Sequence, residues 1–396
     1  MNREKIFTAL LMLYTLLLST TFLAGGAILL MLIFFLIDRK ENLRKKCKIA
    51  CNHPLTILFI IYFLFHIVGY FMSKDKSMAL TDIEHKLSFL ILPPIILGEY
   101  ISKNNIKKVF LFFKNVIIIT LSVLLMYHFI RYNKGLGEFT HFGFRDLSIS
   151  YFYFSVFIIF SILIIDYFKP KYYKFQILIL LFFLLLISNR AAILFILFYY
   201  IFWKKGYKFL LNIRVVFILV LLGLFLFSTD NLLIRKMKVF YRTTDLNMET
   251  IRTKNSISIT HNTLEHRIYI WKLASSLIKE NFLFGIGTGD FQKELNKLYH
   301  QYNFKAAKLK NYNTHNQYLE EFLKFGLIGG LFFIGMIWYL LKISRRKPLF
   351  FLTVLLIAWG SIFESYWFRH HGILFISFFI PLLYKYYLPN NVLDEK

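Results

Sequence analysis

The sequence predicts an all-α polytopic membrane protein with about twelve transmembrane helices and one large helical loop outside the membrane. Composition is the first reason: 57% of the 396 residues are hydrophobic and 47 are Phe, which is far too apolar for a soluble domain. Second, apolar runs alternate with short basic segments along the chain. Third, one long polar segment, 228–322, separates the last apolar runs from the others.

Each apolar run is a candidate crossing, because a bilayer core needs about 20 apolar residues per helix, although several runs are short. The runs are 6–23, 25–37, 55–72, 87–101, 109–130, 147–168, 175–187, 191–202, 213–227, 323–341, 349–366 and 372–388. Residues 6–37 would form one helix of roughly 48 Å, longer than a core of about 30 Å. A hairpin that turns between Ser19 and Gly26 is therefore the better interpretation.

Residues 175–202 are apolar except for Ser188-Asn189-Arg190 near the middle. Lysines flank both ends of this stretch, and positive charge favours the cytoplasmic side. Two short crossings, or a re-entrant pair of helices, would return the chain to the side from which it came.

The distribution of Lys and Arg predicts the orientation, because cytoplasmic segments carry the excess of positive charge. It favours both termini in the cytoplasm and the long loop outside. The chain then divides into an N-terminal bundle of about nine crossings at 1–227, a loop at 228–322, and C-terminal helices with a short cytoplasmic tail at 323–396. The net charge of +26 is mostly this orientation signal plus attraction to anionic membrane lipids. It gives no case for binding nucleic acid.

Cys47 and Cys51 lie near His53 in a basic cytoplasmic segment. A structural metal site would need a fourth ligand, and the segment offers none, so reduced thiols are the better interpretation. We expect no metal and no cofactor.

The long loop has a pattern that favours an ordered structure. Leu264, Ile268 and Trp271 begin an apolar stripe with helical spacing, and charged residues lie opposite. This predicts an amphipathic helix on the membrane surface or on neighbouring helices. Arg267 lies at the edge of the stripe, where its guanidinium can reach a buried anion.

A glycine-rich turn follows this helix, with Gly285, Gly287 and Gly289 before Asp290. A phosphate-binding loop would need a preceding strand in a βαβ unit, and no such strand is evident. A tight turn between two surface helices is the better interpretation, with Asp290 capping the second helix.

His315 and Asn316 lie where the long polar loop meets the next apolar run. Imidazole is the side chain that exchanges a proton near neutral pH. Thr314 and Gln317 fit a capping box that opens a helix, and a helix N-terminus would favour the neutral imidazole that can act as a base. A histidine that only caps or hydrogen-bonds within the loop is an equally good interpretation of this junction taken alone.

Four elements occur in order between residues 175 and 345. They are Ser188-Asn189-Arg190, Arg267 through Trp271 with Ala274, the turn from Asn281 to Phe291, and His315-Asn316 followed by Gly326 and Gly329. Together they resemble the O-antigen ligase and O-antigen polymerase superfamily, and the last element is the most specific. The flanking helices match the superfamily only in number and hydrophobicity.

The resemblance implies a glycosyltransferase fold of the C class, an all-helical membrane bundle whose large exoplasmic loop covers the site. It also implies transfer of a glycan from undecaprenyl diphosphate to a sugar hydroxyl. The acceptor would be a lipid A-core, another glycan or a protein, at the periplasmic face of the bacterial inner membrane.

A glycosyl diphosphate leaves as a stable anion, so this reaction needs charge stabilisation more than a general acid. Arg190 and Arg267 are the candidates, because guanidinium stays charged and forks onto phosphate oxygens. Taken alone, Arg190 could also be a snorkelling interface residue. His315 would act on the acceptor hydroxyl as general base or orient it, with inversion at the anomeric carbon and without a metal.

Three further residues are candidates for contacting the substrate. Asn316 adjoins His315, Lys86 lies at the exoplasmic end of the fourth crossing, and Arg369 precedes His370-His371 in the last exoplasmic turn. For that last turn, a hydrated loop is the simpler interpretation.

Three functions remain open from the sequence. A ligase that attaches finished glycan is slightly preferred, because one long loop carries the whole site. A polymerase that joins repeat units of an O-antigen or exopolysaccharide has the same motifs. A transporter of lipid-linked oligosaccharide would have a similar number of helices, but it should spread charged residues over several helices at the membrane midplane. The oligomeric state is left open.

Overall fold

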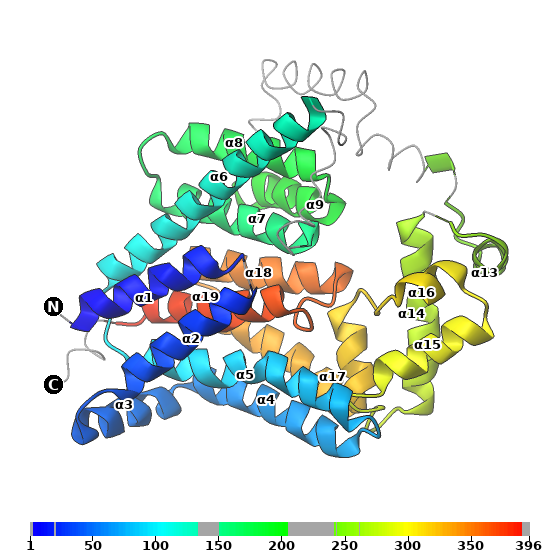
Figure 1. Ribbon diagram of the computed structural model, residues 1–396, viewed down its shortest axis with the longest axis horizontal. Helices are drawn as coiled ribbons and strands as arrows, with labels where there is room; N and C mark the ends of the chain where they lie inside the picture. The colour runs from blue at the N-terminus through cyan, green and yellow to red at the C-terminus, as the bar shows by residue number, and fades with distance from the viewer. Residues whose placement is uncertain are drawn as a thin grey trace.

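The computed structural model describes residues 3–19, 21–133, 150–204, 241–242, 244–260 and 262–389. Every regular element within these ranges is helical (Figure 1). The expected crossing at 213–227 and the start of the long loop lie outside the described residues.

The helices follow one another in the order shown in Figure 1. They are α1 (Arg3–Leu17), α2 (Thr21–Leu36), α3 (Lys40–Asn52), α4 (Pro54–Met72), α5 (Lys76–Gly98), α6 (Lys103–Asn133), α7 (Tyr151–Phe168), α8 (Tyr173–Ile187), α9 (Arg190–Phe198) with the π-helical turn η2 (Tyr199–Trp203), α13 (Met248–Ile257), α14 (Thr263–Glu280), α15 (Phe291–Gln301), α16 (Lys305–Lys310), α17 (Gln317–Ser344), α18 (Pro348–Phe363) and α19 (His370–Tyr386).

Among the described residues, four helices are long and apolar enough to cross a membrane. They are α4, α6, α7 and α17, and shorter apolar helices occur in α2, α8, α9 with η2, and α18. The class of helical membrane protein is confirmed, whereas the number of crossings stays a prediction. The hairpin expected within 6–37 is present, since α1 ends at Leu17 and α2 begins at Thr21.

The stretch 175–202 is divided where the polar residues interrupt it. Ser188 has a left-handed backbone with φ 57° and ends α8, and the Asn189 side chain accepts a hydrogen bond from the Ala192 amide at the start of α9. Asparagine is a favoured N-cap because its oxygen satisfies an amide that the helix leaves unpaired. Two short helices are therefore present, as the charge pattern indicated.

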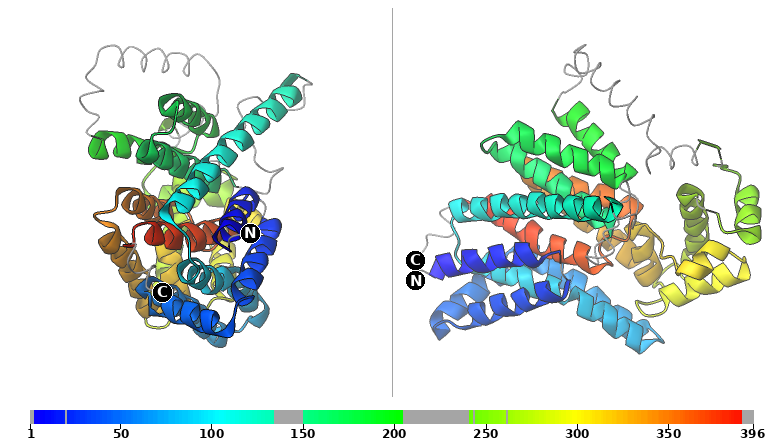
Figure 2. Two further views of the ribbon diagram at one scale, coloured as in Figure 1. Left: turned by 90° about the vertical axis from the view of Figure 1, so that its left-hand side faces the viewer. Right: turned by 45° about the horizontal axis from the view of Figure 1, so that its top comes forward.

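The bundle has α6 to α9 along one side and α3 to α5 along the opposite side, with α19 between them (Figures 1 and 2). α19 is buried over nearly its whole length and packs against α5. Its sequence is apolar all round, which suits a central helix. Aromatic rings fill the space around it: the centroids of Phe160 and Phe379 are 4.7 Å apart, and those of Phe113 and Phe379 are 4.8 Å apart.

Charged contacts join several helices at one end of the bundle. Arg3 at the start of α1 and Lys46 in α3 both bind the carboxylate of Glu99, at 2.8 and 2.7 Å. Lys385 near the end of α19 donates to backbone carbonyls at the end of α5, including Ile96 at 2.8 Å. Cations suit this position, because the last carbonyls of a helix lack partners.

Helices α13 to α16 lie at the opposite end and have a core of their own (Figure 2). This core is made of Ile251, Tyr269, Ile270, Leu273, Ala274, Leu277, Phe291, Leu295, Tyr299, Phe304, Ala306, Ala307 and Leu323. The described part of the long loop is therefore an ordered helical unit. The start of α1 and the end of α19 lie away from it, which agrees with termini and loop on opposite sides.

The buried face of α14 differs from the predicted stripe. Tyr269, Ile270 and Leu273 are buried, while Ile268 and Trp271 are only half-buried. The prediction of an amphipathic helix was right and the choice of its buried face was wrong. The reason is that α13, α15 and α17 pack against the adjoining face, and spacing alone does not reveal which neighbours a helix will have.

Candidate active site

α17 consists of two helical segments that meet at Gly326, whose backbone is non-helical with φ 62° and ψ −155°. The turn after α14 fills this break. Its Ile286 amide donates to the Leu323 carbonyl at 2.8 Å, and its Gly287 amide donates to the Lys324 carbonyl at 2.9 Å. In return, the Leu327 amide donates to the Phe282 carbonyl at 2.7 Å. The turn thus supplies partners for backbone groups that the interrupted helix leaves unpaired.

Glycine is required on both sides of this contact. A Cβ on Gly326 would lie 2.4 Å from the backbone of Leu283, and a Cβ on Gly285 would lie 2.5 Å from the Gly326 nitrogen. Both residues also have positive φ, which side chains disfavour. The glycine turn is therefore a support for the helix break, in agreement with the prediction of a tight turn.

Asp290 fastens the same turn to the connection between α4 and α5. Its carboxylate accepts hydrogen bonds from the amides of Lys74 and Asp75, at 2.5 and 3.1 Å. The Gly289 amide donates to the Ser73 hydroxyl at 2.9 Å. The prediction that Asp290 caps the following helix was wrong, because its oxygens are used on a different segment and α15 has no side-chain cap.

His315 lies just before α17 in a backbone conformation with φ 47°. The helix is capped by Asn316, whose side-chain oxygen accepts from the Leu319 amide at 3.1 Å. The predicted capping box of Thr314 and Gln317 was wrong: the Thr314 hydroxyl donates to the Asn316 carbonyl at 2.9 Å, and Gln317 is buried. The prediction that a helix begins at this point was right, but its cap is one residue after the histidine.

The imidazole of His315 faces a carboxylate that the sequence analysis did not single out as a site residue. Its Nδ1 lies 3.1 Å from each carboxylate oxygen of Glu364, which follows the end of α18. The histidine side chain is 22% exposed, so Nε2 is the ring nitrogen available to a reactant. The sequence signal that could have identified Glu364 is an acidic residue at the end of an apolar run, on the same predicted side of the membrane as His315.

The charge on Glu364 is maintained by its neighbours. Burial raises the pKa of this carboxyl, but His315, followed by Arg267 and Arg369, lowers it further than burial raises it, so the pKa is below its usual value. Glu364 is therefore a carboxylate at neutral pH. A carboxylate on Nδ1 orients the ring and stabilises its protonated form.

The two arginines predicted for the site lie together. The Arg190 guanidinium donates to the Thr263 hydroxyl at 2.7 Å, and Arg267 is one turn further along α14. Arg190 and Arg267 are close enough for their charges to repel, and both interact electrostatically with Tyr151 at the start of α7. Two guanidinium groups held this close are suited to an anion. Sequence reasoning missed Tyr151, which has no distinctive motif.

One face of α14 joins the arginines to the histidine. Thr263, Arg267 and Trp271 recur at intervals of four residues, so they lie on one face of the helix. The Trp271 indole donates to the Thr314 carbonyl at 3.0 Å, one residue before His315. The structure therefore brings Arg190, Arg267 and His315 to the same end of the bundle.

The remaining predicted substrate contacts have different positions. Asn316 uses its oxygen as a helix cap, which leaves its amide nitrogen for a ligand. Arg369 is exposed and lies close enough to Glu364 to affect its charge. Lys86 is completely buried, and its ammonium donates to the Trp367 carbonyl at 2.5 Å. Lys86 therefore lies inside the bundle and not at its surface, and its contact with substrate stays a prediction.

The fold and these side chains define a class, a helical membrane protein with a histidine–carboxylate pair and two arginines at one end of its bundle. Within that class, residues 175–334 match the family model described as O-antigen ligase. The chain therefore carries an O-antigen ligase domain, which confirms the resemblance to that superfamily. No curated protein matches the chain. Members of the family are glycosyltransferase-like enzymes with lipid-linked glycans and glycan acceptors as partners in general.

Proposed function

We propose that this protein transfers a glycan from undecaprenyl diphosphate to a sugar hydroxyl of an acceptor, at the periplasmic face of a bacterial inner membrane. The observation that carries the proposal is the His315–Glu364 pair, held beside Arg190 and Arg267. One group can accept a proton, and the others can hold a diphosphate. Both are needed for glycosyl transfer from a lipid diphosphate.

The arginines would bind the donor. Arg190 would hold the diphosphate from the bundle and Arg267 from the loop, and their mutual repulsion would be relieved by the bound anion. As the bond from the anomeric carbon to the diphosphate oxygen breaks, negative charge develops on that oxygen. Fixed guanidinium groups stabilise it best because they need no reorganisation. We therefore propose a reaction that uses these cations and no metal.

His315 would act on the acceptor. The acceptor oxygen forms a bond to the anomeric carbon, while its proton passes to Nε2 of His315. Glu364, on Nδ1, would stabilise the imidazolium that results. Attack from the side opposite the diphosphate inverts the configuration at the anomeric carbon.

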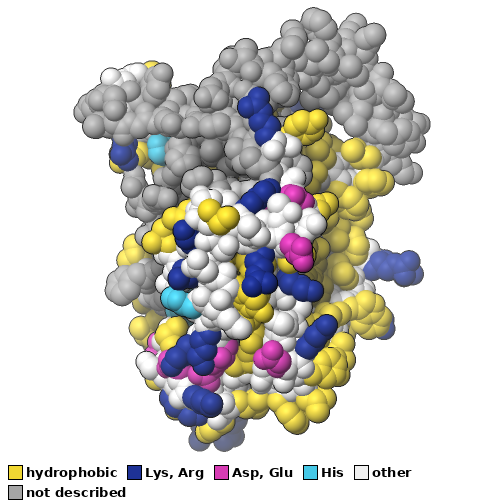
Figure 3. Space-filling model, turned by 90° about the vertical axis from the view of Figure 1, so that its right-hand side faces the viewer, with side chains coloured by type: hydrophobic (Ala, Val, Ile, Leu, Met, Phe, Trp, Pro, Cys, Tyr) yellow, Lys and Arg dark blue, Asp and Glu magenta, His cyan; other side chains and the backbone are white. Residues whose placement is uncertain are grey.

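The surface around the site suits an anionic donor. Figure 3 shows the end that carries α13 to α16, where Lys and Arg side chains are spread over much of the face in view. A positive surface of this kind concentrates anionic substrates and raises their rate of association. The effect is electrostatic, so it should weaken as salt increases.

A ligase remains our preference over a polymerase, because the sequence has one long loop of this kind, which carries both Arg267 and His315. A glycan ladder assay in a deletion strain separates them. Loss of all attached polymer indicates a ligase, whereas a product with a single repeat unit indicates a polymerase.

A transporter is the alternative from another class, and one observation is relevant to it. Charged residues are buried between α4, α5 and α17, near the ends of these helices that adjoin the loop. These charges connect to the segments that hold His315 and Glu364, which favours an enzyme over a translocation path.

Purified protein in lipid, given a labelled lipid-linked glycan and an acceptor, tests the proposal directly. We expect release of undecaprenyl diphosphate and transfer of label to the acceptor, both lost in His315→Ala. His300→Ala is the matched control, because His300 is an exposed histidine of the same loop on α15. Wild-type protein that moves the intact donor across the membrane without releasing diphosphate would favour the transporter.

A further inference from the structure

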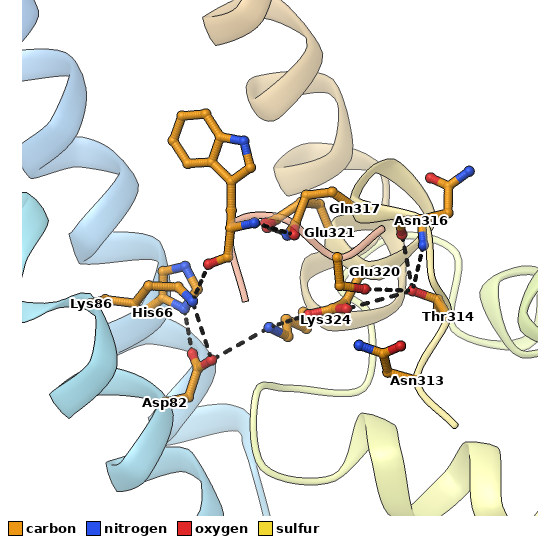
Figure 4. Close-up of polar contacts among 12 residues, drawn as sticks. His66, Asp82, Lys86, Asn313, Thr314, Asn316, Gln317, Glu320, Glu321 and Lys324 are labelled. Atoms are coloured by element: carbon orange, nitrogen blue, oxygen red, sulfur yellow. Dashed lines mark hydrogen bonds and ion pairs between the residues drawn. The ribbon is translucent and has the colours of Figure 1, made fainter. Parts of the chain in front are cut away.

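A cluster of charged side chains is buried between α4, α5 and α17 (Figure 4). At its centre, Asp82 lies 2.5 Å from Nδ1 of His66 through one oxygen. Its other oxygen lies 3.4 Å from the Lys324 ammonium and 3.7 Å from the Lys86 ammonium. All four side chains are at most 3% exposed. Burying so many charges is costly, so a functional role is the default expectation.

Lys324 connects this cluster to the segment that carries His315. Its ammonium lies 2.9 Å from one oxygen of Glu320, one turn earlier in α17. The other oxygen of Glu320 lies 3.5 Å from the Thr314 hydroxyl oxygen, and this hydroxyl donates its hydrogen to the Asn316 carbonyl at 2.9 Å. Thr314 is the residue directly before His315, so only one side chain, Glu320, separates the lysine from the histidine loop.

Lys324 also contacts the segment that carries Glu364. Its ammonium lies over two rings, 4.6 Å from the centroid of Phe368 and 4.7 Å from that of Phe291. Such cation–π contacts strengthen when they are buried. Phe368 belongs to the loop that begins at Glu364, and Phe291 begins α15. One ammonium therefore contacts both sides of the histidine–carboxylate pair.

The segment that carries His315 and the segment that carries Glu364 also contact each other directly. The hydroxyls of Thr314 and Ser365 lie 3.3 Å apart. The Trp367 amide donates to the Gln317 side chain at 2.8 Å, and Gln317 donates to Glu321 at 2.6 Å. The first two contacts fix one segment relative to the other, and the third orients the Gln317 side chain within α17.

His315 needs such support, because its positive φ is an unfavourable conformation for a residue with a side chain. Such a conformation persists only when its surroundings determine it. Buried ion pairs contribute little net stability, but they can select one arrangement over others. The cluster is therefore better explained by the geometry it imposes than by the stability it adds.

We propose that Lys324 is a positioning residue, which holds the segments of His315 and Glu364 in the arrangement that catalysis needs through Glu320 and Phe368. This inference rests on the proposed transferase function. Lys324 does not touch the substrate: it is completely buried, and its effect passes through the residues it binds.

The test is the double variant Glu320→Gln/Lys324→Met, which removes both charges of one pair and leaves no lone charge at that pair. We expect normal amounts in the membrane and a donor KM within about twofold of wild type, because the arginines bind the donor. We expect kcat to fall by about 10- to 100-fold, since a small misplacement of a catalytic group is enough for such a loss. Lys342→Met is the matched control, an exposed lysine in the same helix, and should leave kcat unchanged.

A second pair of variants keeps the inference testable if the double variant fails to insert. Thr314→Ser keeps the hydroxyl between Glu320 and Ser365, whereas Thr314→Val replaces it with a methyl group of similar size. We expect the Ser variant to retain kcat and the Val variant to lose it. Combined with the double variant, Thr314→Val should cause little further loss, because both changes break one connection.

Wild-type kcat in the double variant, or equal kcat in the Ser and Val variants, would overturn the inference. Failure of the proposed function looks different. In that case, wild-type protein releases no undecaprenyl diphosphate, or His315→Ala transfers glycan as wild type does.

Discussion

The two halves of α17 differ in where they place their polar and apolar side chains. Before Gly326, the buried side chains include Gln317, Glu320, Glu321 and Lys324. After Gly326, large apolar side chains are exposed, with Ile328 and Leu331 each 55% exposed and Trp338 62%. The first half has polar residues inside and the second has apolar residues outside, the reverse of a soluble helix.

The difference follows from what surrounds each half. α17 as a whole has the length and composition of a membrane-spanning helix, and the exposed apolar side chains of its second half cost nothing in lipid. The first half is enclosed by protein, where buried charges persist only if they are paired. A single helix therefore combines a membrane anchor with a support for the site. The break at Gly326 separates the two environments.

The largest difference in activity is expected at His315, which lies directly before the polar first half of α17. His315→Ala should lower kcat by about 10²- to 10⁴-fold, the usual contribution of a general base, without loss of inserted protein. Steady-state transfer with labelled donor measures it. Transfer at the wild-type rate by a normally inserted variant would remove His315 from the mechanism.

The junction itself should be the next most sensitive position. Gly326→Ala should lower the free energy of unfolding by about 3 kcal/mol or more, because the new Cβ would clash with the backbone of Leu283 at a positive φ. Gly335→Ala, in the second half, meets no atom within 4 Å and should change stability by less than about 1 kcal/mol. Thermal unfolding in detergent compares them. Equal stability of the two variants would contradict the role of the break.

Alanine variants of one leucine in each half of α17 compare how tightly apolar side chains are packed there. Leu323 is completely buried, so Leu323→Ala should cost about 2–5 kcal/mol through the cavity it leaves. Leu331 is 55% exposed, so Leu331→Ala should cost about 0.5 kcal/mol or less. Chemical denaturation of both variants provides the measurement. A larger loss at Leu331 would mean that protein, and not lipid, covers the second half.

The smallest expected effect concerns the partner of His315. Glu364→Gln should lower kcat by about tenfold or more, because the amide cannot stabilise an imidazolium as a carboxylate does. The pH dependence has a definite sign. Because the folded pKa of Glu364 is lowered, its pairing stabilises the protein above the usual carboxyl pKa, and this contribution is lost as the pH falls through the lowered value.

Thermal stability measured from pH 7 to pH 3 tests this sign. The wild type should lose stability toward acid more steeply than Glu364→Gln, which has no proton to gain at that position. Parallel curves for the two proteins would show that the pair contributes nothing.

Sequence motifs and site geometry were predictable to different degrees. His315 and Arg267 stood out from the residue pattern, the resemblance added their link to Arg190, and the structure then placed all three at one end of the bundle. Glu364 was not predicted as a site residue, because it is far along the chain from His315 and belongs to no motif. Lys86 was assigned to substrate because a charge near a membrane surface and a charge inside a bundle have the same sequence signal.

The sequence by itself determined the class of protein through its hydropathy. It also determined the approximate limits of the helices, because polar residues such as Ser188-Asn189 interrupt the apolar runs. The sequence also placed Gly326 in the most specific element of the family resemblance, whereas the need for glycine there follows from the structure. Only the tertiary structure decided which helix face is buried, which carboxylate faces His315, and which charges are paired inside the bundle. These depend on contacts between residues distant in the chain, and local sequence carries no information about the partner that a side chain will meet.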